Sequence, residues 1–248
     1  MSLQHTEIQK LTETFNEYIT EKTSQALSTL LGEPIDHKLT ILCDGEGNSC
    51  DLSIPTDEIK MCAVRLNGKG DIHIELLYTT KINHAVKIAS KLLGSEVKEI
   101  DEMGSSALQE VANIMTGSFF NALSENTGFK VDLSTPIFGE GELKDLVIAP
   151  AMDVVSPTSH AIITDSLLWG KETGTEIHMF IIQHPEHARK LISQTGENFK
   201  KSSYDDSANT NLIGGENSEI DFLLNDLTST GELSEIDALL KGTIGNSD

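Results

Sequence analysis

Hydrophobic residues near the start of the chain recur every three or four positions. This spacing over residues 8–30, followed by Gly32, predicts an amphipathic helix. Shorter segments that alternate between apolar and polar residues come next, separated by Gly, Asn, Asp and Pro. The strands predicted from these segments are 38–43, 62–68 and 71–79. A second helix is predicted over 82–94, where Gly94 ends it.

The same order of elements recurs in the residues that follow. Long helices are predicted over 106–126 and 184–194. The strands predicted between them are 129–133, 145–150, 159–169 and 175–182. Residues 25–32 also align with residues 121–128 at an offset of 96, through a shared Ala-Leu-Ser string and a final Gly. The pattern predicts an internal repeat of about 8–95 and 104–195, the alternative being a chance match of a short string.

Two repeats of this kind predict an α+β fold. We expect two pseudo-symmetric halves that share one antiparallel sheet, with the long helices packed on one side of it. Residues 1–195 would then form a single domain, because both halves contribute strands to the same sheet.

A change of composition after Gln194 predicts a flexible acidic tail, residues 196–248. The tail contains two similar segments, Ser218–Leu224 and Ser234–Leu240, each with acidic residues near its start and apolar residues at helical spacing. Their apolar positions are Ile220, Leu223, Leu224, Ile236, Leu239 and Leu240. Because so short a helix is unstable alone, we expect each segment to fold in a partner's groove. The alternative is that both fold back on the domain.

The charge of the chain limits its partners. With 39 acidic and 18 basic residues, the net charge is −21, which would repel a phosphate backbone and excludes an unaided nucleic-acid binder. No apolar run approaches the roughly 20 residues that cross a bilayer, so no membrane insertion is expected. The polar N-terminus lacks the pattern of a signal peptide. A cytoplasmic location is therefore expected.

The cysteines and histidines predict neither a disulfide framework nor a metal site. An odd number of cysteines, Cys43, Cys50 and Cys62, in a reducing compartment predicts free thiols, the alternative being a redox pair of Cys43 and Cys50. His184 and His187 lie three residues apart, but no cysteine or carboxylate cluster accompanies them. We therefore expect no metal ligands in this chain.

The helix over residues 105–128 carries the candidate chemistry. Ser106, Glu110, Asn113 and Gly117 fall within an arc of roughly 60° on one face of that helix. The opposite face consists of Leu108, Val111, Met115, Phe119 and Ala122. A carboxamide that can both donate and accept hydrogen bonds is able to orient a water for attack on a phosphoryl group. The neighbouring carboxylate can pair with a lysine of the protein that holds that group.

Residues 106–124 resemble the motif of the CheC/CheX/FliY phosphatases, in which Asp or Ser is followed by three residues, Glu, two residues and Asn. These proteins dephosphorylate the chemotaxis response regulator CheY. The resemblance implies that Asn113 positions the water that attacks the aspartyl phosphate and that Glu110 forms a salt bridge to the receiver's lysine. Ser106 and Gly117 are associated with the motif. It also implies that Mg²⁺ is bound by CheY, so that this chain needs no cofactor.

The first half departs from that motif at the offset of 96. Lys10, Thr14 and Glu17 then stand where Ser106, Glu110 and Asn113 stand in the second half, and Glu21 stands where Gly117 does. At this offset the first-half site has lost both functional side chains. A single active centre is therefore expected.

Residues 233–240 resemble a short segment of the flagellar switch proteins FliM and FliY that binds CheY. The resemblance implies that the tail recruits the substrate.

The expected function is that of a chemotaxis phosphatase, a hydrolase acting on the aspartyl phosphate of CheY. The alternative is a non-catalytic module that docks on CheY or belongs to the flagellar switch. A structural adaptor that engages a protein such as CheD is a third possibility.

Overall fold

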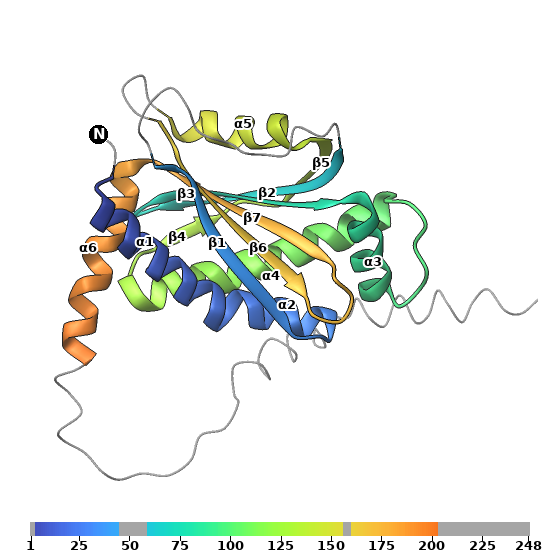
Figure 1. Ribbon diagram of the computed structural model, residues 1–248, viewed down its shortest axis with the longest axis horizontal. Coiled ribbons are helices and arrows are strands. Elements are labelled where there is room, and N and C mark those ends of the chain that lie inside the picture. The colour runs from blue at the N-terminus through green and yellow to red at the C-terminus, as the bar shows by residue number, and fades with distance from the viewer. Residues whose placement is uncertain (1–2, 45–58, 156–159, 203–248) are drawn as a thin grey trace, which may run out of the picture. The chain divides into compact units, whose positions relative to one another are not determined.

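The computed structural model describes residues 3–44, 59–155 and 160–202. The first half consists of α1 (His5–Tyr18), the π-helix η1 (Ile19–Thr23), α2 (Ser24–Leu31), β1 (Ile35–Asp44), β2 (Lys60–Gly70), β3 (His73–Lys81) and α3 (Ile82–Leu93). The second half consists of α4 (Glu102–Thr127), β4 (Val131–Leu133), β5 (Ile137–Glu142), α5 (Leu143–Val154), β6 (Ile162–Gly170), β7 (Glu176–Gln183) and α6 (Pro185–Ser202). Figure 1 shows these elements.

The strands form one antiparallel sheet in the order β1-β6-β7-β3-β2-β4, with β5 also paired to β2. The two halves meet at the centre, where β3 pairs with β7 from Ile74 opposite Gln183 to Thr79 opposite His178. Exchanging β1 with β4 and β5, β2 with β6, and β3 with β7 reverses this order and leaves it otherwise unchanged. The sheet is therefore pseudo-symmetric, and the predicted α+β fold of two halves sharing an antiparallel sheet is confirmed.

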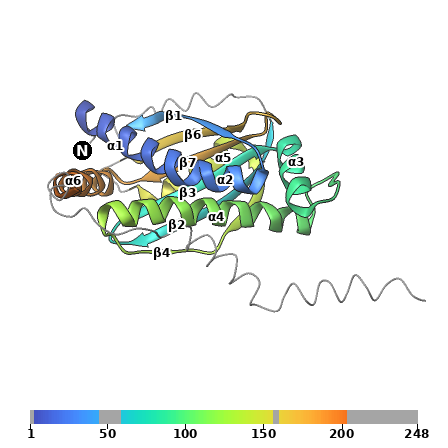
Figure 2. The ribbon, with the colours of Figure 1, turned by 90° about the horizontal axis from the view of Figure 1, so that it is seen from below.

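Helices cover both faces of the sheet. Two long helices, α4 and the continuous helix formed by α1, η1 and α2, lie on one face and α5 lies on the other (Figure 1), while α3 and α6 lie towards opposite ends (Figure 2). Alternate strand residues point to the two layers: Leu66 and Met179 join the core beneath α4, whereas Phe180 packs in the core with Val147 of α5. One face of the sheet thus supports α1, α2 and α4, and the opposite face supports α5.

Two predicted elements differ from the structure. The segment 145–150 was predicted as a strand but lies inside α5, where Val147, Pro150 and Val154 are buried at helical spacing. A short apolar run fits both a strand and one side of a helix, so periodicity could not separate them. The strand of this region is β5 instead. The last helix also continues to Ser202, beyond the predicted end at 194.

The prediction of three free thiols is wrong for Cys43, which is disulfide-bonded. An odd number of cysteines leaves one thiol free but does not prevent the others from pairing, so the preference for free thiols over a paired Cys43 did not follow from the count alone. Cys62 is free and buried. Cys50 and the two tail segments lie outside the residues that the structure describes.

We expect Cys62 to be unreactive in the folded protein. Burial, with a smaller effect of Glu140, raises the pKa of this thiol to about 11 from a usual 9.0, so it stays protonated at neutral pH. At pH 8, alkylation of Cys62 should be about 100-fold slower in the folded protein than in urea. Mass spectrometry of the peptide that contains Cys62 measures both rates. Because the pKa of the thiol is higher in the folded than in the unfolded state, its contribution to stability is complete below about pH 9. This contribution is lost as the pH rises towards 11. Equal rates in both states would contradict this.

Within residues 3–44, 59–155 and 160–202, no helix is long and apolar enough to cross a membrane. The same part of the chain contains no group of three or more histidine, cysteine or acidic side chains arranged to bind a metal ion.

Candidate functional site

Helix α4 is fixed at both ends by its own sequence. The Asp101 side chain accepts a hydrogen bond from the backbone N–H of Gly104 at 2.8 Å and so caps the first turn. Gly128 ends the helix with a φ of 73°, a left-handed conformation that glycine adopts without strain. Between these caps, one side of the helix is buried against β2 and the neighbouring helices. Its exposed side is therefore held at a defined position on the protein.

The structure places the candidate residues on that exposed side. Ser106, Glu110 and Asn113 are exposed and Gly117 is partly exposed, while Leu108, Val111, Met115, Phe119 and Ala122 are buried. A Cβ atom added at Gly117 would meet nothing within 4 Å. The helix therefore presents a carboxylate and a carboxamide one turn apart, beside an open patch of backbone.

The side chains of Glu110 and Asn113 make no hydrogen bond or ion pair with the rest of the described chain. The carboxamide of Asn113 keeps its donor and acceptor atoms available, and Glu110 is available to a cation on a partner. Ser106 differs, because its hydroxyl donates to the backbone carbonyl of Glu102 at 2.8 Å. This hydrogen bond favours a structural role for Ser106 in the helix over a catalytic role.

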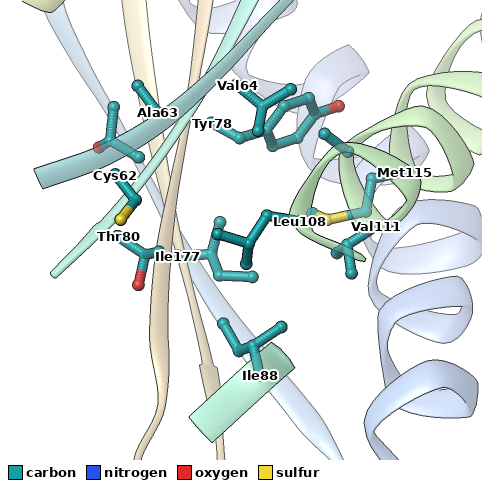
Figure 3. Close-up of a pocket in the computed structure, with 12 residues that line it drawn as sticks. Cys62, Ala63, Val64, Tyr78, Thr80, Ile88, Leu108, Val111, Met115 and Ile177 are labelled. Atoms are coloured by element: carbon teal, nitrogen blue, oxygen red, sulfur yellow. The ribbon is translucent and has the colours of Figure 1, made fainter. Parts of the chain in front are cut away.

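The buried side of α4 is apolar. Leu108, Val111 and Met115 line a small pocket together with Tyr78 of β3 and Ile88 of α3 (Figure 3). The Tyr78 and Thr116 hydroxyls are hydrogen-bonded at 3.0 Å, and burial raises the pKa of Tyr78, so this phenol stays neutral. The pocket anchors the helix and offers no free ionised group for catalysis.

In the first half, α1, η1 and α2 form one continuous helix, which is one residue longer than α4. We call it the first-half helix. The starting residues of the two helices, His5 and Glu102, are 97 positions apart, whereas the glycines that end them, Gly32 and Gly128, are 96 apart. The extra residue is accommodated in η1, where the N–H of Ser24 bonds to the carbonyl five residues earlier. The correct offset is therefore 97 before η1 and 96 after it.

Burial confirms this change of register. Before η1 the buried residues are Leu11, Thr14, Phe15 and Tyr18, which match the buried Leu108, Val111, Ala112 and Met115 of α4 at an offset of 97. Thr14 thus replaces Val111 and not the exposed Glu110. The predicted equivalence of Lys10, Thr14 and Glu17 with the motif residues is wrong, because it carried the offset of 96 through the π-helix.

At the offset of 97, Glu13 and Asn16 correspond to Glu110 and Asn113, and Gln9 corresponds to Ser106. Glu13 is exposed and accepts a hydrogen bond from the Gln9 amide at 3.1 Å. Asn16 is partly exposed, and its carboxamide makes no hydrogen bond within the described chain. The first half therefore carries the same pair of side chains. The signal in the sequence was a Glu followed three residues later by Asn in both helices.

The two long helices contact each other on one face of the sheet, as Figure 2 shows. The Phe119 ring lies 5.7 Å from the Phe15 ring and 6.0 Å from the Tyr18 ring, measured between centroids. A salt bridge of 3.5 Å joins Lys22 to Glu125 across the same contact. The candidate residues of both halves are therefore supported by one shared core.

This fold and these helices define a two-half α+β protein with a Glu–Asn pair on each long helix, exposed on α4 and partly exposed on α1. Residues 103–140 match the model of the CheC-like family. The CheY-P phosphatase CheC of Bacillus subtilis (strain 168) is 23% identical over 146 residues, which cover 56% of this chain and 70% of that protein. Together with the structural neighbours described next, these matches confirm the predicted resemblance to the CheC/CheX/FliY family.

Solved structures share the fold. Thermotoga maritima FliY superimposes with a TM-score of 0.61 at 17% identity, covering 80% of this chain and 100% of that chain. The FliM middle domain from H. pylori does so with a TM-score of 0.52 at 11% identity, covering 77% and 99%. At these identities the likeness concerns the arrangement of the elements.

Proposed function

We propose that this chain hydrolyses the aspartyl phosphate of phosphorylated CheY. The observation that carries the proposal is the exposed pair of Glu110 and Asn113, which are unpaired within the described chain and lie on a helix capped at both ends. Both residues fall in the segment that matches the CheC-like family model, and the CheC relative is named as a CheY-P phosphatase.

In the proposed reaction, the receiver docks on the exposed side of α4. Glu110 pairs with a lysine of the receiver and sets the orientation of the complex. The Asn113 carboxamide accepts a hydrogen bond from a water and donates one to the phosphoryl group. These two hydrogen bonds hold the water in line with the scissile bond. The water oxygen bonds to phosphorus, the bond from phosphorus to the aspartate oxygen breaks, the aspartate leaves as a carboxylate, and the inorganic phosphate keeps the protons of the water. Mg²⁺ would be carried by the receiver.

The proposal includes a second centre at Glu13 and Asn16. These side chains occupy the positions of Glu110 and Asn113 once the π-helix is taken into account, and they face away from the buried side of α1. The same chemistry is therefore available on both long helices. We propose two centres for each chain in place of the single centre expected from the sequence.

The tail is proposed to recruit the substrate. Ser218–Leu224 and Ser234–Leu240 are acidic segments with apolar residues at helical spacing. A tethered segment that binds CheY would raise its concentration near the domain to about the millimolar range.

Loss of phosphate from purified, phosphorylated CheY tests the function. This chain is added at a concentration far below that of CheY, with Mg²⁺ present. Each chain should then release many phosphates. Asn113→Ala should lower the rate, whereas Asn121→Ala, an exposed asparagine further along α4, should not. Binding without any acceleration would overturn the proposal and favour the non-catalytic docking module.

A further inference from the structure

Met103 is exposed in the first turn of α4. The residue is 62% exposed, although methionine is large and apolar. Ser106 and Glu110 follow it by three and seven residues, so helical geometry places all three on one stripe of the surface. Along the helix axis, Met103 lies about 10 Å from Glu110. The stripe that carries the candidate site therefore begins with an apolar side chain.

The first-half stripe lacks this feature. At the offset of 97, Met103 corresponds to Thr6, which is exposed and polar. The position of Gly117 falls within η1, where Thr20 is exposed and its hydroxyl donates to the backbone carbonyl of Asn16 at 2.6 Å. The two centres share the Glu–Asn pair but differ in the surface on either side of it. The second half has an apolar side chain at one end and bare backbone at the other.

This difference concerns binding and not the chemical step. Met103 lies two turns from Glu110, too far to touch the attacking water, but within the area that a docked receiver covers. A flexible thioether can adapt to an apolar patch of a partner, and burying it there favours the complex. Single exposed apolar residues are common on proteins, and the position of Met103 on the stripe gives it significance.

Resting on the proposed function, we infer that Met103 is an apolar docking contact for the receiver and gives the second-half centre the higher affinity. The receiver would present an apolar side chain beyond the lysine that pairs with Glu110. Thr6 and Thr20 make the first-half centre the weaker one. The two centres would then serve different ranges of substrate concentration with the same chemistry.

The test measures each centre alone in the full-length chain. Asn16→Ala leaves the second-half centre, and in that background Met103→Thr should raise KM for phosphorylated CheY about tenfold with kcat unchanged. Asn113→Ala leaves the first-half centre, and Met103→Thr should then change neither constant. In that second background, Thr6→Met should lower KM. Met152→Thr is the matched control, since Met152 is 66% exposed but lies on α5, on the other face of the sheet.

Calorimetric binding of phosphorylated CheY to the Asn16→Ala, Asn113→Ala double variant, with and without Met103→Thr, separates docking from hydrolysis, because neither proposed centre is then active. A tenfold weaker complex supports the inference even if the chain proves not to hydrolyse the phosphate, in which case only the proposed function fails. An unchanged dissociation constant and KM would overturn the inference. A fall in kcat with KM unchanged would overturn it as well, because it would place Met103 in catalysis.

Discussion

Replacing Asn16 and Asn113 together with alanine should lower the rate of CheY dephosphorylation by about 100-fold or more. Each single replacement should leave one centre at work, so its effect is smaller. The reason is geometric: each carboxamide is on an exposed face, is unpaired within the described chain and has the same register relative to a buried helix side. The measurement is phosphate release under steady-state conditions.

Glu17→Ala is the matched control for this prediction. Under the fixed offset of 96, Glu17 would have taken the place of Asn113, whereas under the offset of 97 it corresponds to Ile114. We expect it to retain the activity of the parent chain. Complete loss in Asn113→Ala alone would restore the single-centre interpretation, and full activity of the double variant would exclude the carboxamides from catalysis. All three substitutions are at surface positions and should change stability by no more than about 0.5 kcal/mol.

The sequence predicted the long helices and the exposed face of α4 that carries the candidate residues, because the signals for both are local. Apolar residues at helical spacing mark the buried side of residues 106–126, and the opposite side follows from the same geometry. Hydrophobic alternation likewise indicated the strands around residues 62–68 and 71–79. Each of these features depends on neighbours within one or two turns, so a single sequence contains enough information to predict it.

The sequence argument failed where a non-local or irregular feature decides the outcome. A single inserted residue in η1 shifted the comparison of the two halves and hid Glu13 and Asn16. Their recognition required the burial of Thr14 and Tyr18, which depends on how α1 packs on the sheet. The state of Cys43 likewise depends on backbone geometry that residue spacing does not determine.

The different offsets of the two parts of the first-half helix explain the π-helix η1. The residues that follow η1 align with α4 at one offset and those before it at another, so a regular α-helix could not keep both parts of the first-half helix in register with the sheet. The π-turn lets Leu11 and Leu27 remain buried at the same time. It also keeps Glu13 and Asn16 directed away from the core.

Phe119→Ala should lower the free energy of unfolding by about 3–5 kcal/mol, the range for removing a fully buried aromatic side chain. Phe119 is 0% exposed and its ring contacts Phe15, Tyr18 and Phe120, so a cavity would open between the two long helices. Urea unfolding measures the loss, and Leu133→Ala, at 41% exposure on β4, should lose far less.

The same substitution separates two ways in which the centres could be supported. If the contact between the helices holds both Glu–Asn pairs in place, Phe119→Ala should reduce phosphate release in the Asn16→Ala and Asn113→Ala backgrounds alike, at a temperature where each variant is still folded. If only the sheet supports each helix, stability falls but the activity per folded chain stays at that of the parent. A loss in one background alone would contradict a shared core, because Phe119 touches the first-half helix through both Phe15 and Tyr18.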